Sequence, residues 1–236
     1  MAYVLVHGGG FSGSCWDEIR PWLNGPSYAV DLPGRGRSPA DLASVTAANF
    51  AASVVRTIRE EDLDHVTLVG HSMAGLTLPR VAALIPERLC RLVFVSCSVP
   101  PDGVTILDVL GGLSPGAQEV MARIGEEAMD GGGSLHPALA TAMFCNDMDA
   151  DQVASTLRRM GPESLNVLAD PSDLYGLRHP IPRTYVRLLR DASIELEVQN
   201  QMIANLGEEA DVVDLDAGHM AMISRPQDLA HIINSL

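Results

Sequence analysis

The chain has 236 residues, of which 47% are hydrophobic, so it is long enough to bury the core of one α/β domain. Its 16 basic residues are all arginine, and 30 carboxylates give a formal net charge of −14. This charge argues against nucleic acid and anionic membrane as partners. The absence of lysine excludes Walker-type phosphate loops, Schiff-base chemistry and lysine-dependent dehydrogenases.

The cysteines and the amino terminus predict a cytoplasmic protein with reduced thiols. The four cysteines share no C-x-x-C spacing and are no denser than in an ordinary cytosolic chain. The sequence begins with an apolar strand pattern that lacks the charged start and cleavage site of a signal peptide. No apolar stretch reaches the roughly 18 residues that a membrane helix needs.

Short runs rich in Val, Leu and Ile predict six buried parallel strands. These runs are Tyr3–Val6, Tyr28–Leu32, Val66–Val69, Leu92–Ser96, Thr184–Leu188 and Asp211–Leu215. Segments with helical spacing lie between the first four, at Cys15–Leu23, Ala47–Glu60 and Ala74–Ile85. A last helix is expected to start at the capping-box spacing Ser224-Arg225-Pro226-Gln227 and to end at about Ser235. The alternation predicts an α/β fold with a mostly parallel, doubly wound sheet of about six strands.

This alternation stops between about residues 100 and 178. Glycine clusters and prolines there separate helical pieces such as Gln118–Met129 and Asp151–Met160, and no strand pattern is convincing. An insertion between two core strands would sit at their carboxyl ends, where open α/β sheets bind ligands. We therefore predict a single domain, residues 1–236, with a helical cap insertion over the active site. A set of ordinary peripheral helices is the alternative.

The segment Val66–Gly75 has the pattern of a buried strand, a tight turn and a helix. A nucleophile elbow requires this context, because the serine sits on a sharp strand-to-helix turn with its hydroxyl exposed. Gly70 and Gly75 allow the close backbone approach, whereas Ala74 stands where the usual motif has glycine. Ser72 is therefore the candidate nucleophile, and a buried structural serine is the alternative.

A glycine-rich turn, His7–Gly13, follows the first strand. Its backbone N–H groups are suited to an oxyanion hole, with Gly9 or Gly10 as the donor from the loop. The second donor in such sites is the residue after the nucleophile, here Met73. Further candidates for the substrate pocket are Gly10, Phe11 and His71.

The same turn also satisfies the dinucleotide-binding pattern G-x-G-x-x-G, with Gly8, Gly10 and Gly13. Asp31 ends the next strand, close to where such a site keeps its ribose-binding acid. No good helix former follows directly, however, and Pro21 crowds the next turn. The oxyanion loop is the preferred interpretation, and a dinucleotide site is the alternative.

His219 follows the last predicted strand, in a loop from which an imidazole can reach over the nucleophile. The preceding Gly218 gives the backbone freedom to turn. The orienting acid should follow an earlier strand, in the chain order serine, acid, histidine. Asp191 closes the fifth strand pattern and lies 28 positions before His219. Asp214 and Asp216, on the histidine's own strand, are its rivals.

Taken together, these motifs resemble the α/β-hydrolase superfamily, and within it the plant methylesterase and hydroxynitrile lyase branch and its bacterial esterase relatives. The resemblance rests on Val4–Gly9 with Trp16, Gly70–Met73, Tyr185–Asp191 and Gly218–Met222. It implies ester hydrolysis through an acyl-enzyme, without metal or cofactor, and oxyanion donors at Gly9 and Met73. The lyases of that branch use a lysine near the catalytic histidine, and because this chain has none, their cyanohydrin mechanism is disfavoured.

The sequence thus predicts a serine carboxylic-ester hydrolase that acts on small, mostly uncharged esters. Ser72 would be the nucleophile, His219 the general base and Asp191 the acid that orients the base. A non-hydrolytic protein on the same scaffold is the alternative: a lyase, a cofactor-free oxygenase or a ligand-binding receptor. The sequence predicts neither the substrate nor the oligomeric state.

Overall fold

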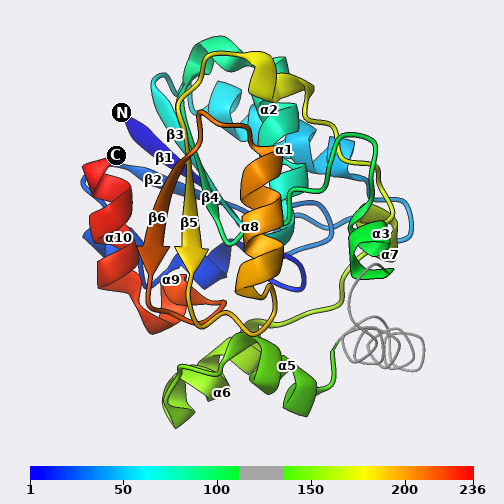
Figure 1. The fold of residues 1–236 in the computed structure, drawn as a ribbon, viewed down its shortest axis with the longest axis vertical. Coiled ribbons are helices and arrows are strands. Elements are labelled where there is room, and N and C mark those ends of the chain that lie inside the picture. Colours follow the sequence, from blue (N-terminus) through cyan, green and yellow to red (C-terminus); the bar gives the residue numbers. More distant parts are fainter. Residues whose placement is uncertain (112–134) are drawn as a thin grey trace.

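The computed structural model describes residues 1–111 and 135–236. Its centre is a six-stranded sheet with the strand order β2-β1-β3-β4-β5-β6 (Figure 1). The strands are β1 (Ala2–Val6), β2 (Ser27–Val30), β3 (Val66–His71), β4 (Leu89–Val95), β5 (Arg183–Leu188) and β6 (Asp211–Leu215). All neighbouring pairs are parallel, so the predicted parallel sheet of about six strands is confirmed.

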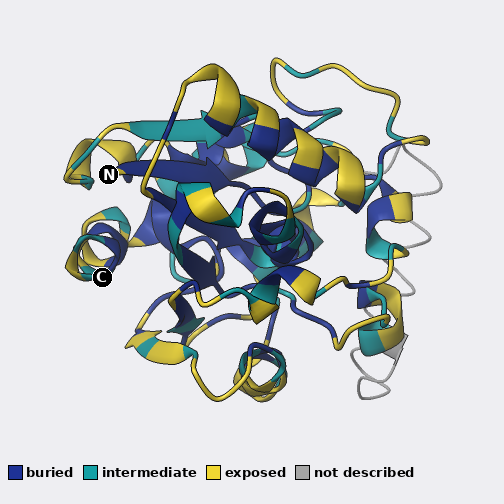
Figure 2. Cartoon of the chain, turned by 90° about the horizontal axis from the view of Figure 1, so that it is seen from above, coloured by how far each residue is buried: buried dark blue, intermediate teal, exposed yellow. Residues whose placement is uncertain are grey.

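Both faces of this sheet are covered. In β1, Val4 and Val6 belong to one hydrophobic cluster, and Tyr3 and Leu5 belong to another. Helices α1 (Ala47–Glu60), α2 (Leu78–Leu84) and α8 (Leu196–Asn205) contribute to the first cluster, whereas α9 (Ala221–Ser224) and α10 (Pro226–Ser235) contribute to the second. Figure 2 shows the middle of the sheet buried at the centre, with exposed residues on the outer sides of the helices. The edge strands β2 and β6 are partly exposed. Burial on both sides explains why inner strands such as β1 and β3 are nearly continuous apolar runs.

Helix α1 has the bounds that the sequence predicts. The Thr46 side chain accepts a hydrogen bond from the Asn49 amide, and the Asn49 side chain accepts one from the Thr46 amide. This capping box satisfies backbone groups that the first helical turn leaves unpaired.

Two predicted helices are broken. The segment predicted as Cys15–Leu23 forms two short 3₁₀ turns, η1 (Gly13–Trp16) and η2 (Arg20–Trp22), because Pro21 has no N–H and disfavours a continuous helix. The segment predicted as Ala74–Ile85 forms η3 (Ser72–Leu76) followed by α2. Pro79 lies in the first turn of α2, the position where a helix tolerates proline, so a new helix starts there. A further 3₁₀ turn, η4 (Pro86–Arg88), precedes β4.

The capping box predicted for the last helix is wrong. Ser224 ends α9, and its hydroxyl donates to Oδ2 of Asp147 at 2.8 Å rather than capping α10. Arg225 is the N-cap residue and makes no side-chain cap bond, whereas Pro226 opens α10. The end of this helix at Ser235 is as predicted.

The described part of the segment between β4 and β5 contains helices and turns but no strand. These elements are α3 (Ile106–Gly111), α5 (Pro137–Phe144), α6 (Ala150–Arg159), α7 (Leu165–Leu168) and η5 (Tyr175–Arg178). The helix predicted at Asp151–Met160 is α6, shifted by one residue, and the one predicted at Gln118–Met129 lies outside the described residues. The arrowheads of β5 and β6 point toward the side where α5 and α6 lie (Figure 1). None of the helices in the described ranges has the length and apolar character of a membrane span.

Candidate active site

Ser72 directly follows β3 and is the first residue of η3. Its φ of +54° is in the left-handed region, where a residue with a side chain is uncommon and strained. The turn is packed tightly against the loop after β4, because the Ser98 amide donates to the Ser72 carbonyl at 2.9 Å. A Cβ at Gly75 would collide with the Ser98 carbonyl oxygen. The observed turn therefore has the strand-turn-helix geometry of a nucleophile elbow.

His219 and Asp191 are brought together from two loops at the carboxyl ends of β5 and β6. The His219 Nδ1 atom lies 2.7 Å from Oδ2 of Asp191, and both side chains are almost completely buried. Because an ionised carboxylate only accepts, Nδ1 carries the proton and donates. This bond leaves the other ring nitrogen, Nε2, with the lone pair that a general base needs.

The Asp191 carboxylate is held by four donors. Oδ2 also accepts from the Ser96 hydroxyl at 2.6 Å, and Oδ1 accepts from the backbone amides of Ser193 and Ile194 at 2.7 and 2.8 Å. Burial by itself raises the pKa of Asp191, but the electrostatic interaction with His219 and these hydrogen bonds outweigh it and lower the pKa below its usual value. The carboxylate is therefore ionised and fixed in orientation.

The loop that carries His219 is also held by three further contacts. His71 Nε2 lies 2.9 Å from the His219 carbonyl oxygen and, since that oxygen only accepts, donates to it. Burial and the neighbouring His219 lower the pKa of His71 well below its usual value, so its ring is neutral. The Gly218 amide donates to Oδ2 of Asp147 at 2.8 Å, and the ring of Phe144 stacks on His219 with centroids 5.3 Å apart.

Within the described residues, the Ser72 hydroxyl makes no hydrogen bond to His219. A nucleophile–base bond is often long before substrate binds and tightens in the complex. The structure thus joins the candidate base to its acid, and it places the candidate nucleophile beside the cavity described below.

The glycine loop lies directly against the nucleophile turn. A Cβ at Gly8 would lie 2.8 Å from the Ser72 Cβ, and one at Gly9 would lie 3.7 Å from the Met73 sulfur. The loop and the residue after Ser72, the two expected sources of oxyanion donors, are therefore neighbours. The Gly10 amide is occupied, because it donates to Oε2 of Glu163 at 2.7 Å. Gly9 is thus the better candidate for the loop donor.

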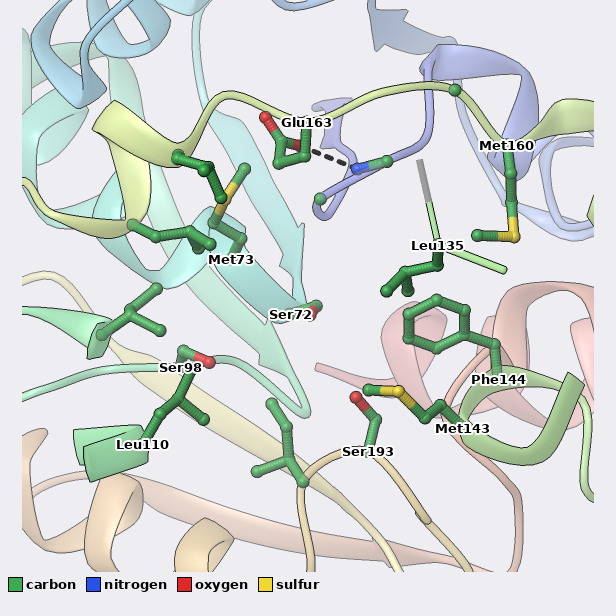
Figure 3. A pocket seen from close by; sticks show the side chains of 17 residues that line it. Ser72, Met73, Ser98, Leu110, Leu135, Met143, Phe144, Met160, Glu163 and Ser193 are labelled. Carbon is green, nitrogen blue, oxygen red and sulfur yellow. Dashed lines mark hydrogen bonds between the residues drawn. The ribbon is translucent and has the colours of Figure 1, made fainter. Parts of the chain in front are cut away.

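A cavity of about 190 Å³ opens beside Ser72. Its described lining is mainly apolar, and Figure 3 shows Ser72 facing it, with Met143 and Phe144 on one side and Glu163 on another. Of the three predicted pocket residues, Gly10 lines the cavity. Phe11 and His71 are not among its described lining: Phe11 packs edge-on against Phe144, and the His71 ring contacts that of His219, with centroids 4.5 Å apart.

Asp31, the candidate ribose-binding acid, and Asp214 and Asp216, the rivals of Asp191, all have other partners in the structure. Asp31 accepts from the backbone amides of Gly13 and Arg37, both at 2.9 Å, and only a short 3₁₀ turn follows the glycine loop. This arrangement lacks the helix N-terminus on which a dinucleotide pyrophosphate rests. Asp214 and Asp216 form ion pairs with arginines near the surface, with their side chains 44% and 74% exposed.

The sequence does not predict three polar residues of the site: Ser96, Asp147 and Glu163. A serine at the carboxyl end of a buried strand is a signal that would have found Ser96. No local pattern marks the two acids, since their partners are distant in sequence. Within the two described ranges, no group of three or more His, Cys, Asp or Glu residues is arranged to hold a metal ion.

Comparisons with known proteins agree with this architecture. Methylesterase 9 of Arabidopsis thaliana is 26% identical over 249 residues, covering 96% of this chain and 94% of that protein. The pyrethroid hydrolase of Sphingobium wenxiniae is 24% identical over 241 residues, covering 98% and 85%. An extracellular alpha/beta-hydrolase from a Paenibacillus species has the same fold, with a TM-score of 0.86, 23% identity and coverage of 100% and 98%.

The chain is thus distantly homologous to plant methylesterases and to a bacterial pyrethroid hydrolase. Polyneuridine aldehyde esterase has the same fold, with a TM-score of 0.76, 21% identity and coverage of 99% of this chain and 98% of that structure. The sequence pattern of the alpha/beta hydrolase family matches residues 3–232. The chain belongs to the alpha/beta hydrolase family.

Proposed function

We propose that this protein is a serine carboxylic-ester hydrolase that works through an acyl-enzyme. The observation that carries the proposal is the buried Asp191–His219 hydrogen bond of 2.7 Å, together with a serine in strained elbow geometry that lines a cavity. A serine hydroxyl, a carboxylate and an imidazole, in the chain order Ser72, Asp191, His219, are the groups that acyl transfer requires.

The proposed reaction begins when His219 Nε2 takes the proton of the Ser72 hydroxyl as its oxygen attacks the ester carbonyl. The backbone amides of Gly9 and Met73 donate to the oxyanion that forms. His219 then gives the proton to the leaving alcohol as the carbon–oxygen bond breaks, leaving the acyl group on Ser72. Water, deprotonated by His219, attacks this acyl group, and the carboxylic acid departs as Ser72 recovers its proton. Asp191 stays ionised throughout and holds the imidazole in the required tautomer.

The cavity favours small, uncharged esters. Its volume of about 190 Å³ suits a compact ligand, and its described lining is dominated by Leu, Ile, Met and Phe side chains. Glu163 is the charged residue of this lining, and no basic side chain belongs to it. An ester that carries a carboxylate would therefore lose hydration without gaining a countercharge. The relatives named methylesterase and pyrethroid hydrolase support hydrolysis as the reaction type.

Replacement of the nucleophile tests the proposal. Ser72→Ala is expected to abolish turnover of a short p-nitrophenyl ester, and a fluorophosphonate is expected to label Ser72 in the wild type, as located by peptide mass spectrometry. Ser12→Ala serves as the control and should keep both properties, because the Ser12 hydroxyl, although it belongs to the glycine-rich turn, bonds to that of Ser14 and is not part of the described cavity lining. Full turnover by Ser72→Ala, or a label on another residue, would refute the assignment. Tight ligand binding by a wild type without turnover would favour a receptor instead.

A further inference from the structure

The segment Gly161–Glu163 follows α6 and binds the glycine-rich turn through the backbone carbonyl and amide of Gly10. The Gly161 amide donates to the Gly10 carbonyl at 2.8 Å, and the Gly10 amide donates to Oε2 of Glu163 at 2.7 Å. The dashed line in Figure 3 marks the second of these bonds. Gly10 is the one residue of this loop with a φ in the left-handed region, +72°. The conformation of the loop at Gly10 is therefore held by a distant part of the chain, since Glu163 lies 153 residues after Gly10.

Glu163 is itself held rigidly. Its other oxygen, Oε1, accepts from the Arg35 guanidinium and from the Ser164 amide, the latter at 2.6 Å. The Arg35 side chain is 4% exposed and that of Glu163 is 15% exposed, so both charges are largely removed from water. Buried pairs with good geometry and additional hydrogen bonds are costly to break, because one partner then stays uncompensated. The carboxylate is thus a fixed anchor rather than a mobile surface group.

The anchor lies one residue from the proposed oxyanion donor. A Cβ at Gly9 would lie 3.3 Å from Oε2 of Glu163, so the carboxylate packs directly on this residue. Gly9 and Gly10 share a planar peptide unit, because the carbonyl of Gly9 and the amide of Gly10 belong to it. Fixing the Gly10 amide therefore restricts the rotation of the Gly9 backbone, whose own amide is to face the oxyanion.

We propose that Glu163 is a positioning residue for the oxyanion hole: it clamps the Gly10 amide so that the Gly9 amide faces the reacting carbonyl. The inference rests on the proposed esterase function. A bare carboxylate at this place would repel the oxyanion that forms beside it. Arg35 offsets that charge from the side away from Gly10, since it binds the oxygen that Gly10 does not use. The pair holds the loop without leaving an uncompensated negative charge next to the oxyanion.

The test compares Glu163→Ala and Glu163→Gln with the wild type. Each protein is titrated with a fluorophosphonate to count its active sites, and kcat per active site and KM are measured with a short p-nitrophenyl ester. Glu18→Ala is the matched control, because Glu18 forms a similar half-buried pair with Arg159 of α6, at 2.7 Å, but does not line the cavity. Thermal unfolding of all four proteins reports the general loss of stability.

For Glu163→Ala we expect kcat per active site to fall by about 10- to 100-fold, below the loss of about 10²- to 10³-fold known for removal of an oxyanion donor. KM should change little, and Glu18→Ala should keep its kcat. Glu163→Gln should lose less, because an amide oxygen still accepts from Gly10 while its NH₂ group opposes Arg35. If Glu163→Ala does not fold, Glu163→Gln decides alone, and at least a threefold loss is expected.

A kcat per active site within about twofold of the wild type in the folded Glu163 variants, or a loss confined to KM, would overturn the inference. An equal loss in Glu18→Ala would also overturn it, because the effect would then be one of general stability. A wild type that neither turns over esters nor takes the label on Ser72 would instead refute the proposed function. The two failures are thus distinguishable in one set of measurements.

Discussion

Asp191→Asn is the change whose effect follows most directly from the geometry. The backbone amides of Ser193 and Ile194 both donate to Oδ1, and neither can turn away. The asparagine oxygen must therefore take this place, since an NH₂ group there would leave two buried donors without acceptors, at about 1–3 kcal/mol each. The NH₂ group then falls at the position of Oδ2, where it faces His219 and Ser96.

An NH₂ group in that position reverses the hydrogen bond to the imidazole. Nδ1 of His219 would have to accept, so the proton would move to Nε2, and the ring would lose the lone pair that deprotonates Ser72. Ser96 would adapt, because its hydroxyl both donates and accepts. We expect the fold to be kept and kcat to fall by about 10⁴-fold, which corresponds to about 5 kcal/mol of transition-state stabilisation.

The assay is steady-state hydrolysis of a short p-nitrophenyl ester, with thermal unfolding to confirm that the variant is folded. Asp214→Asn and Asp216→Asn are the controls, because both side chains are exposed and pair with Arg187 and Arg190 rather than with His219. Both should stay within about twofold of the wild type. A folded Asp191→Asn protein that keeps more than about a tenth of kcat, or a large loss in either control, would refute the reasoning.

Two predictions concern stability. His7 is fully buried, its Nε2 accepts from the Leu32 amide, and burial lowers its pKa from 6.5 to about 4. Between these two values the unfolded chain binds more protons than the native one, so the free energy of unfolding falls as the pH falls. Urea unfolding should show that His7 contributes a loss of about 2 kcal/mol in this free energy between about pH 7 and about pH 5. Gly75→Ala should destabilise the protein by about 3 kcal/mol in the same assay, because its Cβ would collide with the Ser98 carbonyl oxygen.

Both stability predictions have internal controls. His7→Gln should lower stability at neutral pH yet remove its share of the pH dependence, whereas an unchanged pH dependence would show that His7 does not carry it. The buried His71, whose pKa is also lowered, is present in both proteins, so its contribution cancels in the comparison. Gly161→Ala should change stability by less than about 0.5 kcal/mol, since nothing lies within 4 Å of a Cβ there. A similar loss in both glycine variants would contradict the steric argument.

The sheet could be predicted from the sequence because each strand carries its own signal. A strand covered on both faces must be apolar throughout, and no partner needs to be known for that pattern to appear. Helix α1 can be predicted equally well, since its apolar residues repeat with the helical period. The 3₁₀ turns cannot be predicted in this way. Proline interrupts a helical pattern, but packing around Trp16 and Leu78 decides whether the chain before it forms a helix or tight turns.

In the candidate site, too, residues with a local sequence pattern can be predicted, whereas residues whose partners are distant in sequence cannot. Ser72 and His219 have local signals, namely a turn of small residues and a loop after a strand, and chain order adds Asp191. The groups that hold these residues have partners far away in sequence: Ser96 is 95 residues from Asp191, Asp147 is 71 from Gly218, and Glu163 is 128 from Arg35. Such pairs form only when the fold brings the segments together, so a single sequence contains no spacing that predicts them.

The departure at Ala74 from the usual elbow motif is explained by the same kind of contact. Ala74 is 1% exposed and packs across from Gly70, where a Cβ would lie 3.0 Å from that of Ala74 and 2.5 Å from Cδ1 of Leu78. Space at this crossing of strand and helix is thus provided by Gly70, and one methyl group fits on the helix side. The close approach to the loop after β4 is made one residue later, at Gly75. The elbow therefore requires glycine at 70 and 75, and alanine at 74 is compatible with the strained backbone at Ser72.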